Sequence, residues 1–292
     1  MGTSDYISTG KKILHIQVGL FLFYTFSITW AMWSVIIIGN IYFDTLWYGE
    51  PLFWIPMLLG ALGPPIATFI LCKQFRGEFT DVPFWKFIIG PKPSKSGWWI
   101  FLFYTAWRLI MVWIAFGVNE SIAFLYMLIN LPLFMIGGGL EEVGWRGYLQ
   151  PQLEKIFTYI PSVFIVGVIW SLWHIPLWFI EGTIQSALSF GTYTLLAIIL
   201  SFSLTTIYTK TKNLFLTIFS HAWFNGCIGL VVYIGSDGYL ELDIQWVVFV
   251  VFAMEFFVSF LMVFFKAQGL GKVKLECPEE QVKLRERKLD NK

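Results

Sequence analysis

The chain has 292 residues, of which 57% are hydrophobic, 20% aromatic and only 13% charged. A typical soluble domain carries about 25% charged residues, so this composition excludes a soluble protein. Three cysteines are too few for a secreted disulfide scaffold. A net charge of +1 without a basic face gives no argument for nucleic-acid binding. The composition predicts an all-α polytopic membrane protein.

Apolar runs long enough to cross a bilayer occur along most of the chain. They lack the alternation of barrel strands, and backbone polar groups in lipid must be satisfied within each segment, so helices are expected. The first run is too long for a cleavable signal peptide, and no cleavage site follows it. We predict an N-terminal tail (1–17), a membrane domain of about eight helices around a polar cavity (18–265) and a charged tail (266–292). The predicted spans are 18–39, 52–72, 97–117, 122–140, 160–180, 187–208, 213–234 and 246–265.

Basic residues are confined to one side of this eight-span layout. The N-terminal tail, the loops after the second, fourth and sixth spans, and the C-terminal tail hold every Lys and Arg except Arg108, which lies in the third span. The opposite loops carry acidic residues and no basic ones. Because cytoplasmic loops are enriched in Lys and Arg, we expect a multi-pass protein of the cell membrane with both termini cytoplasmic.

Ionisable residues within spans are costly unless they are paired or face water, so they are the candidate functional residues. The densest group is EEVGWRGYLQ (141–150), at the end of the fourth span. Glu142 and Arg146 are four residues apart, the spacing at which a carboxylate and a guanidinium meet on a helix. Glu141 projects ~100° away and is left available. The alternative interpretation is a solvated charge cluster at a helix end.

Two of the three histidines also lie within spans. His174 occurs in WSLWHIPLW, and His221 has Asn225 one turn further along the same helical face. Each histidine alone is typical of a hydrogen-bonded packing residue, but three helices with inward polar groups favour one water-accessible pocket. Arg108 and Glu255 are expected to pair with each other; alternatively, one of them joins the site.

A carboxylate with a histidine can activate water, and a second histidine with an amide can stabilise an oxyanion. Together, the carboxylate, the two histidines and the amide predict hydrolysis of an amide bond by direct attack of water. The sequence contains no HExxH motif, no Gly-x-Ser-x-Gly motif and no aspartate within a predicted span.

EEVGWR (141–146), His174 and HAWFN (221–225), in this order, resemble the CPBP family of CAAX proteases and bacteriocin-processing or immunity proteins, also called the Abi family. The family pattern is EExxxR, FxxxH and HxxxN or HxxxD. The first and third motifs are complete; in the second, Trp170 replaces the usual phenylalanine. The resemblance covers about residues 120–235 and the eight-helix plan. It implies that Glu141 and His174 are base and water-positioner, His221 and Asn225 hold the oxyanion, and Glu142 and Arg146 form a structural pair.

The resemblance implies an intramembrane endopeptidase that hydrolyses a peptide or lipidated peptide arriving from the membrane or the cytoplasmic side. We expect no cofactor, because an amide is a poor zinc ligand. The alternative is a divalent metal such as zinc held by Glu141, His174 and His221. Two other functions stay open: a non-catalytic immunity or scaffold protein of the same family, and a proton-coupled transporter that uses these residues as a relay.

Overall fold

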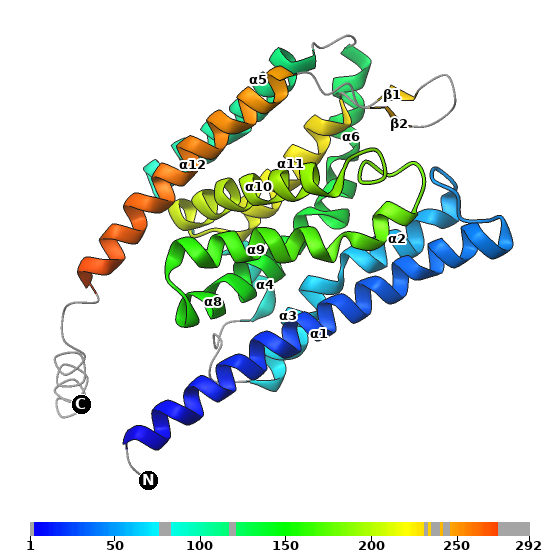
Figure 1. The fold of residues 1–292 in the computed structure, drawn as a ribbon. Coiled ribbons are helices and arrows are strands. Elements are labelled where there is room, and N and C mark those ends of the chain that lie inside the picture. The colour runs from blue at the N-terminus through cyan, green and yellow to red at the C-terminus, as the bar shows by residue number, and fades with distance from the viewer. Residues whose placement is uncertain are drawn as a thin grey trace.

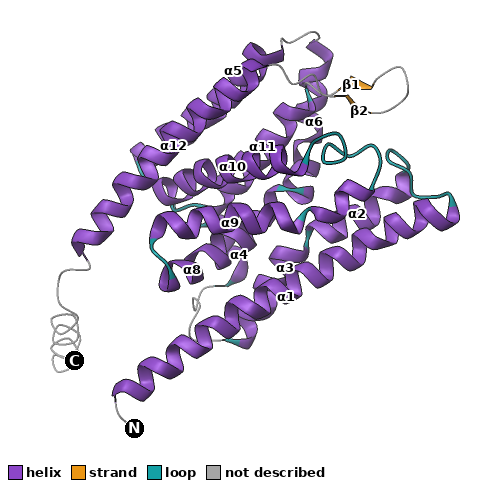
Figure 2. Ribbon diagram, in the orientation of Figure 1, coloured by secondary structure: helices purple, strands orange, loops and turns teal. Residues whose placement is uncertain are grey.

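A computed structural model describes residues 3–75, 83–116, 121–230, 233–234, 240–241 and 246–273. Helices form nearly all of the described chain (Figure 2). The strands β1 (Tyr233–Ile234) and β2 (Leu240–Glu241) make only a short antiparallel ladder. The all-α fold class predicted from composition is therefore confirmed.

Five helical stretches of the described chain are long and apolar enough to cross a bilayer. They coincide with the first, second, fifth, sixth and eighth predicted spans, which confirms a polytopic membrane protein. The helices in these stretches are α1 (Thr3–Phe43), α2 (Trp54–Ala61) continued by α3 (Gly63–Gln74), α9 (Tyr159–Trp173), α10 (Phe190–Thr211) and α12 (Trp246–Val273).

The other three predicted spans coincide with helices α5 (Lys95–Phe116), α6 (Ser121–Gly137) and α11 (Leu214–Gly229). Helix α11 is apolar but has 16 residues, which rise about 24 Å, less than the ~30 Å of a hydrocarbon core. The count of eight spans and the enclosed polar cavity stay predictions.

Helices α9, α10 and α11 lie in the middle of the bundle, with α1–α3 on one side and α5 and α12 on the other (Figure 1). Helix α10 packs against α9, α11, α12 and α5. A Cβ atom on Gly167 of α9 would lie 2.8 Å from the Cα of Ile198 in α10, so this glycine permits close packing of the two helices. The short helix α4 (Phe84–Ile89) also contacts α11.

Between α6 and α9 the chain forms a series of short helical turns instead of one straight helix. The fourth predicted span, 122–140, ends early at Gly137, where three consecutive glycines disfavour a helix. The turns that follow are a 3₁₀ turn (Gly139–Glu141), α7 (Glu142–Gly144), a π-helical turn (Trp145–Leu149) and α8 (Gln150–Ile156). We call residues 138–149 the interrupted segment.

The interrupted segment is buried inside the bundle. Glu141 is 3% exposed and Glu142 is fully buried. The two carboxylates therefore do not form the solvated helix end that was the alternative interpretation of this cluster. Non-helical backbone at membrane depth is tolerated where protein surrounds it, and π-turns often occur at functional sites.

A second buried polar group joins four helices. Nη2 of Arg108 in α5 lies 3.5 Å from Oε1 of Glu255 in α12, as expected for a structural pair. Arg108 also donates to the carbonyl and hydroxyl oxygens of Ser220 in α11, at 2.5 and 2.8 Å, and to the hydroxyl of Ser203 in α10, at 3.0 Å. Because Ser220 directly precedes His221, this group supports the helix that carries a candidate site residue.

The membrane orientation predicts which loops external reagents reach. Helix α1 begins and α12 ends on the same side of the bundle (Figure 1), and we expect this side to be cytoplasmic. In a background without the three native cysteines, a membrane-impermeant maleimide added to cells should label Asp237→Cys but not Lys92→Cys. Asp237 lies outside the described residues. Labelling of Lys92→Cys from outside would contradict the eight-span layout.

Candidate active site

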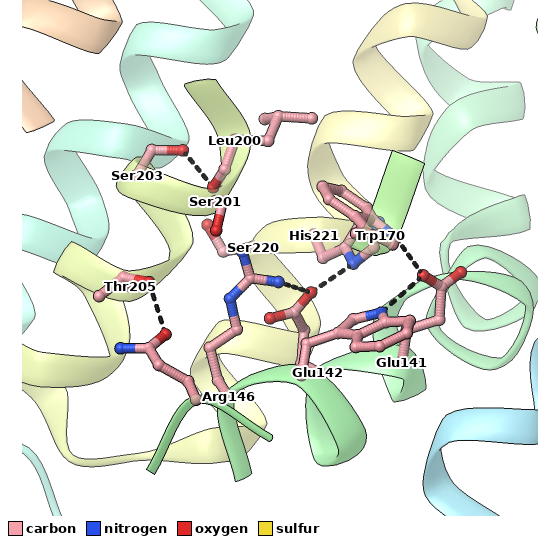
Figure 3. A network of polar contacts seen from close by, with 12 residues as sticks. Glu141, Glu142, Arg146, Trp170, Leu200, Ser201, Ser203, Thr205, Ser220 and His221 are labelled. Atoms are coloured by element: carbon pink, nitrogen blue, oxygen red, sulfur yellow. Dashed lines mark hydrogen bonds and ion pairs between the residues drawn. The ribbon is translucent and has the colours of Figure 1, made fainter. Parts of the chain in front are cut away.

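Glu141 accepts two indole N–H groups on one carboxylate oxygen (Figure 3). Nε1 of Trp170 donates to Oε2 at 2.7 Å, and Nε1 of Trp145 donates to the same oxygen at 3.3 Å. No donor among the described residues reaches the other oxygen, Oε1. The carboxylate is therefore anchored through one oxygen and keeps the other for a further partner.

Glu142 connects the interrupted segment to helix α11. Its Oε1 accepts from Nη1 of Arg146 at 3.1 Å and from Nδ1 of His221 at 2.9 Å (Figure 3). All three side chains are buried, with at most 3% of any of them exposed. Because a carboxylate oxygen only accepts, Nδ1 of His221 carries the hydrogen in this contact. The Arg146 contact has the helical spacing expected from the sequence, whereas the His221 contact depends on the tertiary fold.

His174 follows the last residue of α9, and its ring is fixed by a backbone contact. Its Nδ1 lies 2.8 Å from the carbonyl oxygen of Trp170. A carbonyl only accepts, so Nδ1 carries the proton and Nε2 has the lone pair that a base needs. Four aromatic rings surround the imidazole, those of Trp33, Trp170, Trp173 and Tyr193.

Asn225 lies one helical turn after His221 on α11 and is half-buried. Its amide makes no hydrogen bond to a described residue. A Cβ atom on Gly138 would collide with Nδ2 of Asn225, and one on Gly139 would lie 2.6 Å from the carbonyl oxygen of Ile218. The two glycines therefore permit the interrupted segment to approach α11 closely.

The structure thus places Glu141, Arg146, His174 and His221 around Trp170. Glu142 joins this cluster through Arg146 and His221, and Asn225 lies close to Gly138. Oε2 of Glu142 and Nε and Nη2 of Arg146 have no hydrogen-bond partner among the described residues. Four further polar ends of the predicted site residues make none to the described chain either. They are Oε1 of Glu141, Nε2 of His174, Nε2 of His221 and the amide of Asn225.

Two tryptophans of this cluster were not predicted to be site residues. The chain has 15 tryptophans, so their presence in apolar helices is not informative by itself. Their spacing from the predicted residues is the informative signal. Trp145 lies four residues after Glu141, and Trp170 lies four residues before His174. On a helix these positions share a face, and an indole N–H buried beside a carboxylate is expected to donate to it.

The alternative of a metal centre requires its possible ligands to lie close together. Within the ranges that the structure describes, no group of three or more His, Cys, Asp and Glu side chains is arranged to hold a metal ion. Glu141, His174 and His221 do not form such a group among the described residues. We assign no step to a metal, and independence from a cofactor stays a prediction.

Comparisons with known proteins show what the part of the chain that holds this site is similar to. Residues 122–227 match the family model described as "Type II CAAX prenyl endopeptidase Rce1-like". This range includes all six motif residues, from Glu141 to Asn225. The resemblance to the CPBP family of CAAX proteases is confirmed for this part of the chain.

One curated relative is the CAAX prenyl protease 2 of Methanococcus maripaludis. It is 25% identical over 181 residues, which cover 57% of this chain and 64% of the archaeal protein. The alignment therefore spans less than two thirds of the relative's length.

The two adjacent glutamates should contribute differently to stability. In Glu142→Gln the buried Arg146 loses its carboxylate, so we expect the free energy of unfolding to fall by about 3–5 kcal/mol. Glu141→Gln keeps an amide oxygen that can accept both indole N–H groups, so its stability should stay close to that of the wild type. Unfolding of the purified proteins in detergent micelles measures both changes. Equal destabilisation by the two substitutions would contradict this division.

Proposed function

We propose that this chain is an intramembrane endopeptidase of the CAAX type, which hydrolyses a peptide bond in a prenylated peptide. The family match and the name of the archaeal relative support this class of reaction and substrate. The observation that carries the proposal is that Glu141 and His174 are both held by Trp170. Both bind Trp170 through one atom, and each keeps an acceptor without a partner in the described chain.

In the proposed reaction, water attacks the scissile carbonyl directly. Oε1 of Glu141 and Nε2 of His174 accept the two hydrogens of the water, which orients its lone pair toward the carbonyl carbon. The Glu141 carboxylate takes one proton as the C–O bond forms, and it returns this proton to the amine as the C–N bond breaks. General base catalysis of this kind contributes ~10²–10⁴-fold to a rate.

His221 and Asn225 are the proposed donors to the tetrahedral oxyanion. Nδ1 of His221 already donates to Glu142, so Nε2 can donate only if the ring carries both protons. A carboxylate in contact stabilises such a cation. The Glu142 carboxylate therefore has a proposed function in addition to its pairing with Arg146. The neutral amide of Asn225 supplies the second donor.

The proposed substrate reaches the site from the bilayer or the cytoplasmic side, because a prenyl chain partitions into lipid. The test uses purified protein in nanodiscs with quenched fluorescent peptides that do or do not carry a C-terminal farnesyl cysteine motif. Wild type should cleave the farnesylated peptide, and Glu141→Gln should reduce kcat by ~10²–10⁴-fold while remaining folded. Glu50→Gln, in an exposed loop, is the matched control and should be as active as the wild type.

Other outcomes separate the alternatives. Equal cleavage of both peptides would overturn the prenyl requirement but keep the hydrolase. Binding without cleavage would support the non-catalytic family member, and proton flux dependent on Glu141 would support the transporter. Full activity after exhaustive treatment with chelators supports direct attack by Glu141-activated water. Loss of activity that stoichiometric zinc restores would instead make Glu141 and the histidines ligands.

The oxyanion proposal predicts the effects of two substitutions. Asn225→Ala should lower kcat by ~10²–10³-fold with little effect on KM, because it removes one oxyanion donor. Gly138→Ala should also lower kcat, but by less, because the new methyl group would displace only the amide end of the Asn225 side chain. Steady-state kinetics and thermal unfolding measure both.

The adjacent glycine provides the control for this pair. In Gly139→Ala the methyl group would meet the backbone of Ile218, so this variant should lose thermal stability, unlike Gly138→Ala. A fully active Gly138→Ala enzyme would count against the assigned position of Asn225.

A further inference from the structure

Trp170 binds both members of the proposed water-activating pair. Its indole Nε1 donates to Oε2 of Glu141 at 2.7 Å, and its carbonyl oxygen accepts from Nδ1 of His174 at 2.8 Å. One residue thus connects a carboxylate on the interrupted segment to an imidazole after the end of α9.

The Trp170 ring is also enclosed by the other charged and polar groups of the site. It lies edge-on to His221, with ring centroids 5.1 Å apart and an interplanar angle of 83°. The guanidinium carbon of Arg146 lies 5.6 Å from its centroid. Trp170 is 3% exposed, so these contacts leave the ring little freedom to change rotamer.

The indole N–H group distinguishes Trp170 from the phenylalanine that is usual at this position of the FxxxH pattern. A phenylalanine would fill part of the same space, but it has no donor for Oε2 of Glu141. Trp145 donates to the same oxygen at 3.3 Å, a longer and weaker contact. The shorter contact therefore comes from the residue that departs from the family pattern.

We propose that Trp170 is a positioning residue that sets the distance and orientation between the Glu141 carboxylate and the His174 imidazole. Its two bonding groups are separated by only two side-chain torsions, χ1 and χ2, so fixing the ring fixes both partners. We call these two contacts of Trp170 the clamp. It occupies Oε2 of Glu141 and Nδ1 of His174, and it thereby directs Oε1 of Glu141 and Nε2 of His174 to the water. This inference rests on the proposed hydrolase.

The first test observes the contact without measuring activity. In ¹⁵N-tryptophan-labelled protein, the indole resonance that disappears in Trp170→Phe identifies Trp170. If Trp170→Phe does not fold, Trp170→Tyr provides the assignment. Glu141→Gln replaces a charged acceptor with a neutral one, so the Trp170 indole proton should move upfield. The resonance of Trp223, which donates to the carbonyl of Thr105, should stay in place. An unchanged Trp170 resonance would overturn the clamp.

The second test measures catalysis. Trp170→Phe should lower kcat by about 10- to 100-fold, the range expected for losing one hydrogen bond to a charged group, while KM stays within about twofold of the wild-type value. Trp223→Phe also loses one indole hydrogen bond on α11 and should keep wild-type kcat. Trp170→Phe with wild-type kcat would overturn the positioning role. Absence of cleavage by the wild type would instead reject the proposed function, and the resonance test would still decide whether the clamp exists.

Discussion

The site depends on the pairing of the buried Glu142 carboxylate with Arg146 and His221. A charge removed from water is costly unless it is paired, and Glu142 meets this constraint with Arg146 from its own segment and His221 from α11. The pairing holds a non-helical piece of chain against a helix that lies far away in the sequence. Ser220, the residue before His221, accepts hydrogen bonds from Arg108, and Arg108 pairs with Glu255. Helices α5, α11 and α12 and the interrupted segment are therefore connected by charge pairs and hydrogen bonds within an otherwise apolar bundle.

The two histidines differ in the partner of Nδ1, and this difference supports different roles. His174 faces a neutral backbone carbonyl, which favours a neutral ring with a free lone pair on Nε2. His221 faces the carboxylate of Glu142. In the proposed reaction, His174 accepts a hydrogen from water and His221 donates to the developing negative charge. The fold thus places two identical side chains beside different partners, a neutral carbonyl and a carboxylate.

The sequence was sufficient for contacts that depend on local spacing and insufficient for those that depend on the fold. Composition identified the membrane class, and the four-residue interval identified the Glu142–Arg146 contact. The Glu142–His221 bond joins residues 79 positions apart, which no periodicity predicts. Trp145 and Trp170 were missed because the same aromatic residues in apolar helices also face lipid or fill the core. The position at which the fourth span ends was predicted three residues late, because a run of glycines is still apolar enough to count as part of a membrane span.

Interruptions of regular helix are what bring the proposed reacting groups together. On a straight continuation of α6, Glu141 would lie at the end of a spanning helix, whereas His174 would lie far along the next long helix. Instead, α6 ends at Gly137 and the chain turns within the bundle, and α9 ends at Trp173 with His174 immediately after it. Both residues therefore lie where the backbone is irregular. Tertiary contacts, and not a continuous helix, orient their side chains. Irregular backbone at membrane depth is tolerated only where protein or water surrounds it, so burial of the interrupted segment against α11 is a condition for the site as well as for stability.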